Sequence, residues 1–302
     1  MLARAAACVL AGALLSLCIP GVAQARTDNR SKPVVYVHGL DAFGTAGADC
    51  NMWSNMKSTL ASWGWTGAAA TIRYYEGDTN CSYAVEHHGS HARHWGGAGE
   101  HNSAGTSHTA NTQIEHLAYH LAWTIYDHFS VNGTYVDLVG HSMGGLIARY
   151  AVAQVQRGHA DFPPALRVED VVTLGTPHGG SGWGDWCGWA DQCDQIANDD
   201  YLMGWLRTNA SNPQGTGGTD WTAMGSYDDG LVSEGSAVDM GGAHKVNYLG
   251  SMNLGHSDYY NDTTDARDAD VEYWDAPGPW YSWFSAPHAV RWSDFGLLYG
   301  SW

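Results

Sequence analysis

The sequence predicts an α/β fold with a mostly parallel central sheet and helices on both faces. Short apolar runs have the length and composition of buried strands, and they lie at 33–38, 69–75, 135–139, 168–174 and 245–249. Apolar residues recur at helical spacing between several of these runs, over 51–63, 114–129 and 146–157. A strand, helix, strand order favours parallel pairing, because the helix returns the chain to the same end of the sheet.

The 302-residue length is sufficient for one α/β domain with a full hydrophobic core. Arg4 precedes an apolar run at 5–19, and Ala23-Gln24-Ala25 has the Ala-x-Ala pattern of a signal-peptidase site. We therefore expect a signal peptide at 1–25 and a secreted, extracellular protein. The mature chain, 26–302, is expected to be a single α/β domain with insertions near 76–110 and 181–225.

The charge of the chain excludes some classes of partner. The formal net charge is −17, with only 14 Lys and Arg residues, so a nucleic-acid partner is not expected. No later apolar run is long enough for a membrane span. The mature chain is therefore predicted to have no integral membrane segment.

Four cysteines remain after removal of the signal peptide, namely Cys50, Cys81, Cys187 and Cys193. An even number in a secreted chain predicts two disulfides, and three pairings are possible. We favour Cys50–Cys81 and Cys187–Cys193, since neighbours in sequence close loops without threading. The alternative, a zinc site, would want a C-x-x-C spacing that the sequence does not have.

The pattern Gly140-His141-Ser142-Met143-Gly144 joins the apolar run at 135–139 directly to the helical pattern at 146–157. A turn this tight strains the serine backbone and exposes its hydroxyl, and the flanking glycines avoid steric clashes. The sequence therefore predicts a nucleophile elbow with Ser142 as the nucleophile.

A base and an acid follow in the order Ser, Asp, His, with Asp229 and His256 as the preferred residues. Gly230 allows a turn after Asp229, and His256 follows a predicted strand. The sequence leaves five alternatives open, namely His244 and His288 as base, and Asp228, Asp239 and Asp258 as acid. His38, His141 and His178 are expected to be hydrogen-bonded structural histidines. The backbone amides of Leu40 and Met143 are the expected oxyanion hole.

Two further clusters allow more than one interpretation. Histidines crowd the region from His87 to His108 without a recognisable metal-ligand spacing, so we expect a polar loop, no metal site and no cofactor.

A helix is expected at 114–129, and a capping box at 112–115 should start it. Its polar residues His116, His120 and Asp127 are expected to be solvated. Trp183, Trp186 and Trp189 fit either a satellite core under a long loop or an acyl-binding wall or lid over the site.

Four motifs carry a family resemblance: Val37-His38-Gly39-Leu40, Gly140-His141-Ser142-Met143-Gly144-Gly145, Gly175-Thr176-Pro177-His178-Gly179 and Asp229-Gly230-Leu231-Val232. Together they resemble secreted bacterial lipases and related esterases of the α/β-hydrolase superfamily. The long separation between His38 and Ser142 departs from the compact members of that group.

The resemblance implies an α/β-hydrolase fold and a secreted carboxylic ester hydrolase that cleaves acyl esters of lipids through an acyl-enzyme on Ser142. It also implies Asp229 as the acid, His256 as the base, and an ester or lipid substrate. The alternatives on the same triad are a phospholipase A1, an aryl-ester or polyester hydrolase, and an acyltransferase. An alternative from another class is a non-catalytic protein that binds carbohydrate through its Trp and Tyr residues.

Overall fold

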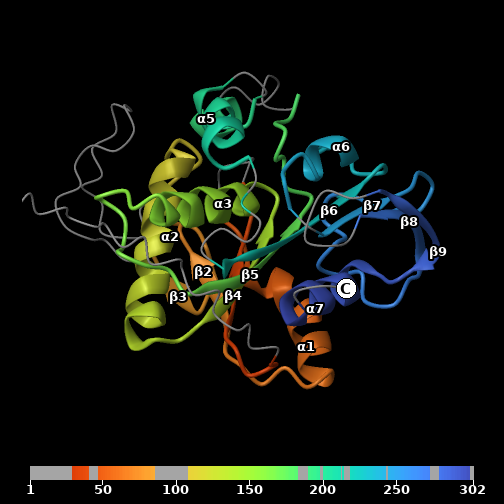
Figure 1. Ribbon diagram of the computed structural model, residues 1–302, viewed down its shortest axis with the longest axis horizontal. Coiled ribbons are helices and arrows are strands. Elements are labelled where there is room, and N and C mark those ends of the chain that lie inside the picture. Colours follow the sequence, from red (N-terminus) through yellow and green to blue (C-terminus); the bar gives the residue numbers. More distant parts are fainter. Residues whose placement is uncertain are drawn as a thin grey trace, which may run out of the picture.

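The computed structural model describes residues 29–40, 47–85, 108–182, 190–197, 200–211, 213, 218–242, 244–272 and 279–299. Within these residues the strands form one nine-stranded sheet in the order β3-β2-β1-β4-β5-β6-β7-β8-β9 (Figure 1). The strands are β1 (Val34–Val37), β2 (Ala69–Arg73), β3 (Tyr83–Ala84), β4 (Val136–His141), β5 (Val168–Leu174), β6 (Asp220–Ser226), β7 (His244–Tyr248), β8 (Arg267–Glu272) and β9 (Tyr281–Ala286).

The strands from β3 to β7 pair in parallel, while the β7–β8 and β8–β9 pairs are antiparallel. The parallel strands place their carboxyl ends along one edge of the sheet, where functional loops of open α/β folds gather. The predicted mostly parallel sheet of an α/β-hydrolase fold is thus confirmed.

Helices cover both faces of the sheet (Figure 1). They are α1 (Ser54–Ser62), α2 (Ile114–His128), α3 (Met143–Gln156), α4 (Asp191–Gln195), α5 (Tyr201–Asn209), α6 (Glu234–Ala237) and α7 (Ala289–Leu298). Alternate residues of β1 enter two separate cores, as the two-residue period of a strand requires. Val35 and Val37 pack in the core that includes α2 and α3, whereas Val34 and Tyr36 pack in the core that includes α1 and α7.

Strand β6 is the main element that the sequence did not predict. All seven of its residues are buried, and it lies between β5 and β7 in the sheet. Polar and small residues interrupt its apolar pattern, which reads Asp-Trp-Thr-Ala-Met-Gly-Ser. The insertion expected at 181–225 therefore extends into a strand of the central sheet.

The predicted capping box of α2 is wrong. The N-cap residue Gln113 makes no side-chain capping bond. Instead, the side-chain oxygen of Gln195 accepts a hydrogen bond of 2.7 Å from the Ile114 amide, and its amide group donates to Glu115. A residue 81 positions beyond Ile114 caps the helix, which no local pattern could indicate.

A buried lysine ties the amino-terminal segment to the opposite edge of the sheet from the carboxyl strand ends. Lys32 Nζ lies 3.0 Å from Asp137, 2.8 Å from Glu169 and 2.9 Å from Asp170. Burial alone would lower the pKa of Lys32, but the three carboxylates outweigh it and raise the pKa. The ammonium thus balances acidic residues at the starts of β4 and β5.

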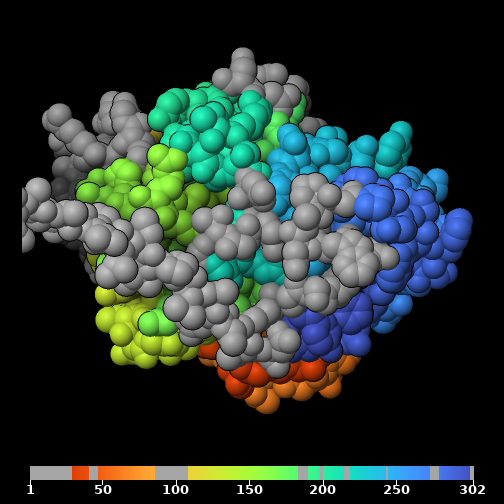
Figure 2. All heavy atoms as spheres, viewed as in Figure 1, coloured from red at the N-terminus to blue at the C-terminus, as the bar shows by residue number. Residues whose placement is uncertain are grey.

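The structure contains the predicted Cys50–Cys81 disulfide. Cys187 of the second predicted disulfide lies outside the described residues. In the part of the chain that the structure describes, no helix has both the length and the apolar character needed to cross a membrane. Figure 2 shows α5 at the top of the surface, α1 at the bottom and the β8–β9 hairpin at one side.

Candidate active site

Ser142 occupies the turn between β4 and α3, at the carboxyl edge of the sheet. Its φ is 54° and its ψ is −132°, a left-handed conformation that costs energy in a non-glycine residue. A side chain at Gly144 would place a Cβ 2.3 Å from the Val37 carbonyl oxygen, and one at Gly140 would place it 2.7 Å from Gly145 Cα. The two glycines therefore allow β1, β4 and α3 to approach closely enough to form the turn.

Three side chains from separate loops form a continuous hydrogen-bonded chain. Ser142 Oγ lies 2.9 Å from His256 Nε2, and His256 Nδ1 lies 2.8 Å from Asp229 Oδ2. Asp229 follows β6 and His256 follows β7, while Ser142 follows β4. The structure thus brings together the preferred nucleophile, acid and base at the carboxyl ends of three parallel strands.

Asp229 is buried but well supplied with hydrogen-bond donors. Its Oδ1 accepts from the amides of Leu231 at 2.9 Å and Val232 at 3.0 Å, and Tyr259 donates to its Oδ2 at 3.2 Å. Burial alone would raise the pKa of Asp229, but the hydrogen bond and charge of His256 and the two amides lower it. The carboxylate therefore remains ionised beside the imidazole.

His141 positions the loop that carries His256. Its Nε2 donates a 2.7 Å hydrogen bond to the His256 carbonyl oxygen. Burial, followed by the charge of His256, lowers the pKa of His141 to about 3. The neutral His141 ring thus holds the backbone of His256 and does not compete with it for a proton.

The loop after β1 lies directly against the nucleophile. A Cβ at Gly39 would lie 2.7 Å from Ser142 Cβ and 3.2 Å from Ser142 Oγ. Tyr74 holds this loop, because its hydroxyl donates to the carbonyl oxygens of His38 and Gly39. The segment that includes Leu40 is therefore fixed beside Ser142. Met143, whose amide is the other expected oxyanion donor, is the first residue of α3.

The remaining candidates for the base lie elsewhere. His244 begins β7, at the amino end of the strand, and is buried with its Nδ1 3.6 Å from Asp220. His288 accepts a hydrogen bond from the Arg291 amide at the start of α7. The structure therefore contradicts both as alternatives to His256, because each is engaged away from the Ser142 turn.

The remaining candidates for the acid contact other groups than the His256 ring. Asp228 accepts from the amides of Ser251 and Asn253, and Asp258 accepts from the Gly255 amide. Asp239 lies next to Gly179. Asp229 is the carboxylate that contacts His256, while its neighbour Asp228 is intermediate in exposure and binds the other two amides.

The three histidines that were expected to be structural are hydrogen-bonded. His38 Nε2 lies 2.8 Å from Asp78, and His178 Nε2 lies 3.0 Å from Thr173 Oγ1. His141 makes the bond to the His256 carbonyl described above. These contacts agree with the predicted structural positions.

The expectation that His116 and His120 are solvated is wrong. Both are 1% exposed, and they meet His108, which is 2% exposed. The side of α2 that carries them contacts His108 instead of facing water. Only Asp127 of that expected set is exposed. Trp183, Trp186 and Trp189 lie outside the described residues.

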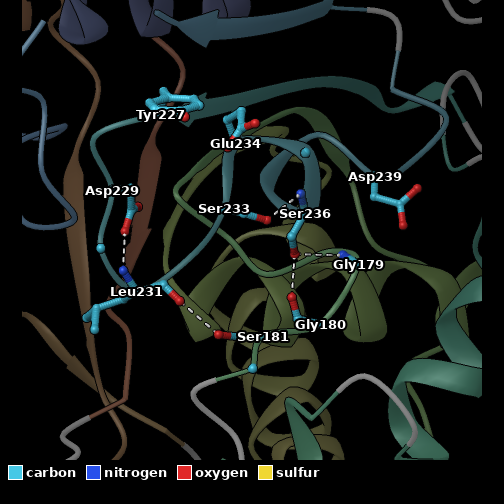
Figure 3. A pocket seen from close by; sticks show the side chains of 13 residues that line it. Gly179, Gly180, Ser181, Tyr227, Asp229, Leu231, Ser233, Glu234, Ser236 and Asp239 are labelled. Carbon is cyan, nitrogen blue, oxygen red and sulfur yellow. Dashed lines mark hydrogen bonds between the residues drawn. The ribbon is translucent and has the colours of Figure 1, made fainter. Parts of the chain in front are cut away.

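A cavity of about 750 Å³ borders Asp229 and is lined mainly by glycine, serine and acidic side chains (Figure 3). Ser236 Oγ accepts from the Gly179 amide and donates to the Gly180 carbonyl, and Ser181 donates to the Leu231 carbonyl. Neither Ser142 nor His256 lines this cavity. The wall beside Asp229 is therefore polar.

Comparisons with solved structures identify several lipolytic proteins at low identity. The mature lipase BlEst2 of Bacillus licheniformis is 17% identical, with a TM-score of 0.44 over 70% of this chain and 81% of the lipase. Phospholipase PlaB of Legionella pneumophila is 12% identical, with a TM-score of 0.45 over 68% of this chain and 44% of the phospholipase. Lipase B of Aspergillus fumigatus is 15% identical, with a TM-score of 0.39 over 72% of this chain and 43% of that lipase.

This chain thus spans less than half the length of the Legionella and Aspergillus proteins. A comparison with curated proteins found no match.

A comparison with protein families gives a match over the strands and helices that build the nucleophile turn. Residues 30–184, about half of the chain, match the PGAP1-like alpha/beta domain. This range includes β1, β4, α3 and Ser142. The chain therefore belongs to the family of the PGAP1-like alpha/beta domain, with the mostly parallel sheet and nucleophile turn of an α/β-hydrolase fold.

Proposed function

We propose that this protein is a serine carboxylic ester hydrolase that cleaves acyl esters of lipids or related substrates through an acyl-enzyme on Ser142. One observation carries the proposal: Ser142, His256 and Asp229 are joined by hydrogen bonds of 2.9 and 2.8 Å. A serine hydroxyl is a weak nucleophile unless a base contacts it. Here the base is in contact and is itself oriented by a carboxylate.

In the proposed reaction, His256 Nε2 takes the Ser142 hydroxyl proton as Oγ attacks the ester carbonyl carbon. The carbonyl oxygen gains negative charge, and the amides of Leu40 and Met143 donate to it. The C–O bond to the alcohol then breaks, and His256 gives its proton to the leaving alcohol. Asp229 stabilises the imidazolium during both transfers.

Water then hydrolyses the acyl-enzyme. His256 removes a proton from a water molecule, which attacks the acyl carbonyl carbon. The bond to Ser142 Oγ breaks and the oxygen takes back the proton from His256. The products are a carboxylic acid and the free enzyme, so atoms and protons balance over the cycle.

Fluorophosphonate labelling tests this proposal. The wild-type chain should react and hydrolyse a nitrophenyl ester, whereas Ser142→Ala should lose labelling and at least about 10³-fold of its kcat, since residues of a triad act as a unit. Ser58→Ala is a matched control, because Ser58 is exposed on α1. Equal labelling of Ser142→Ala and wild type would contradict the proposal.

A substrate panel then separates the alternatives on the same triad. Long-chain acylglycerols, a phospholipid, a feruloyl ester and a polyester film represent the lipase, phospholipase A1, aryl-ester and polyester activities. Preferential release of fatty acid from acylglycerol supports the proposed substrate class. Acyl transfer to an added alcohol in preference to water would instead assign an acyltransferase, and sugar binding without any turnover would assign a binding protein.

The proposal includes secretion with removal of residues 1–25. The Ala23-Gln24-Ala25 pattern supports this step. Mass spectrometry of the exported protein should give an amino terminus at Arg26. Retention of Met1 in the active protein would contradict it.

A further inference from the structure

We propose that His108, His116 and His120 form a binding site for a divalent transition-metal ion, for which Zn²⁺ is the best fit. The three imidazoles are 1–2% exposed. His116 Nε2 lies 3.1 Å from His108 Nε2 and 2.9 Å from His120 Nε2. The ligand nitrogens of all three lie within 4.8 Å of one another. Three ring nitrogens thus converge on one buried point.

The fold explains why these residues meet. His116 and His120 are four residues apart on α2, so they lie on one face of the helix. His108 precedes the helix and forms a parallel bridge with Tyr75, just beyond β2. Its carbonyl oxygen accepts a 3.0 Å hydrogen bond from the Glu76 amide. The site therefore joins the start of α2 to the end of β2.

Protons alone satisfy this arrangement poorly. An imidazole nitrogen has one in-plane site, which holds either a hydrogen or a lone pair. His116 Nε2 faces two other ring nitrogens, so it cannot donate to one and accept from the other along a single direction. A cation that receives one lone pair from each ring satisfies all three nitrogens together.

The tautomer of His108 fits the role of a ligand. Its Nδ1 lies 3.0 Å from the Tyr74 carbonyl oxygen, which can only accept, so Nδ1 carries the hydrogen. In a neutral ring, Nε2 then presents its lone pair to the other two histidines. A backbone carbonyl that fixes the tautomer in this way is the usual outer partner of a metal-binding histidine.

The spacing and chemistry favour zinc over the alkaline-earth ions. Zinc–nitrogen bonds of about 2.0–2.1 Å in a tetrahedron place two ligand nitrogens roughly 3.3 Å apart, within a few tenths of the distances given above. Among the described residues, the cluster consists of imidazole nitrogens alone, whereas Ca²⁺ and Mg²⁺ prefer oxygen ligands. The three histidines would supply three of the four tetrahedral positions.

One residue, Tyr74, connects the three-histidine site to the loop beside Ser142. Tyr74 accepts from His108 through its carbonyl and donates through its hydroxyl to the carbonyl oxygens of His38 and Gly39. The rings of Tyr74 and His38 stack with centroids 4.0 Å apart. A metal at the three histidines would therefore stabilise the base of this loop and would take no part in ester chemistry.

Metal analysis of the purified full chain tests the site. Elemental mass spectrometry should give one equivalent of zinc in the wild-type chain. The control variant His128→Gln should give the same result, since His128 is exposed on the same helix. His116→Gln and His120→Gln should each weaken Zn²⁺ binding by more than the roughly 10–100-fold that loss of an outer partner costs. A chelator should lower the Tm of the wild-type chain, and Zn²⁺ should restore it.

Two measurements test the metal site even if a histidine variant does not fold. Co²⁺ added to the chelated wild-type chain should give the visible absorption of a tetrahedral nitrogen-bound ion, without any substitution. Ser142→Ala should bind zinc as the wild type does, so a failure of the proposed esterase and a failure of the metal site are distinguishable. A wild-type chain that holds less than a tenth of an equivalent of any transition metal after Zn²⁺ loading would overturn the inference.

Discussion

At Ser142 the backbone lies in the left-handed region, with φ 54°. Such a conformation costs a non-glycine residue about 1–3 kcal/mol, and it persists because neighbouring contacts determine it. The Ser142 amide donates to the Leu174 carbonyl oxygen at 2.9 Å, and the Gly145 amide donates to the Ser142 carbonyl oxygen at 3.1 Å. The strain is thus held by β5 and by the first turn of α3.

Gly39 provides a test of how closely the loop after β1 must approach Ser142. In Gly39→Ala the new methyl group would lie 2.7 Å from Ser142 Cβ, so the loop and its Leu40 amide must move away. We expect kcat to fall by about 10²–10³-fold, as on loss of one oxyanion donor, with a smaller effect on KM. Steady-state kinetics on a nitrophenyl ester measure both constants.

Gly204→Ala is the matched control for this substitution. A Cβ at Gly204 would have no atom within 4 Å, and the residue lies inside α5. Alanine there should stabilise the helix by roughly 0.5–1 kcal/mol without changing kcat. If Gly39→Ala retained the wild-type kcat, the assignment of the Leu40 amide would be wrong.

At the scale of elements, the turn after β2 is organised by one carboxylate. Asp78 accepts hydrogen bonds from the amides of Tyr74 at 2.9 Å, Tyr75 at 2.8 Å and Ala48 at 2.7 Å, and from the His38 ring at 2.8 Å. Burial alone would raise the pKa of Asp78, but the His38 hydrogen bond and charge and the backbone amides lower it. This turn therefore links β1, β2 and the segment before α1.

Asp78→Asn should change the pH dependence of stability. Because the folded pKa is lowered, the ionised carboxylate stabilises the fold above its unfolded pKa of about 3.9. That contribution is lost as the pH falls through the lower folded value. We expect the variant to be about 2–3 kcal/mol less stable at pH 7, with a difference that shrinks in acid, measured by urea unfolding at several pH values.

Asp127→Asn controls for the change in net charge, because Asp127 is exposed on α2. It should follow the wild-type curve. A constant stability gap between Asp78→Asn and wild type from pH 7 to pH 3 would show that the carboxylate charge does not matter.

Local patterns predicted elements whose signals lie within a few residues. The helix that became α2, the strand β4 and the turn at Ser142 were all visible in this way. Strand β6 was missed because its burial depends on neighbours on both sides, and not on an apolar sequence. The Gln195 cap of α2 and the meeting of His108 with His116 and His120 also depend on tertiary contacts that sequence spacing does not encode.

The site was predictable where chain order constrains it. Asp229 and His256 follow Ser142 in the order that this fold requires, and each follows a strand of the parallel sheet. The roles of His141 and Tyr259 were not predictable, because each acts through a contact with a residue on a distant loop. His141 and His256, whose carbonyl oxygen it contacts, are 115 positions apart. A local sequence pattern cannot identify such a partner.

At the scale of the whole molecule, the Lys32 cluster balances charges that the sheet has buried. Asp137 and Asp170 are fully buried, and the ligand oxygens of Asp137, Glu169 and Asp170 lie within 4.8 Å of one another. The Lys32 ammonium lies within 3.0 Å of each of the three carboxylates. The cluster also reaches α7, since Lys32 Nζ lies 3.5 Å from the Leu297 carbonyl oxygen.

Lys32→Met should therefore destabilise the entire fold. Removal of one partner of a buried ion pair costs about 3–5 kcal/mol, because the opposite charge stays buried. Urea unfolding should show this loss, and the double variant Lys32→Met with Asp137→Asn should lose less than the sum of the single variants. Lys57→Met on α1 is the control and should change stability by about 0.5 kcal/mol or less. An additive double variant would contradict the ion-pair account.

The three residues of the Ser142, His256 and Asp229 chain are delivered by loops that follow β4, β7 and β6, and Ser142 and His256 are 114 positions apart. No amino-terminal fragment that stops short of β7 contains all three. Turnover by the proposed esterase would therefore return only after distant parts of the polypeptide have docked during refolding.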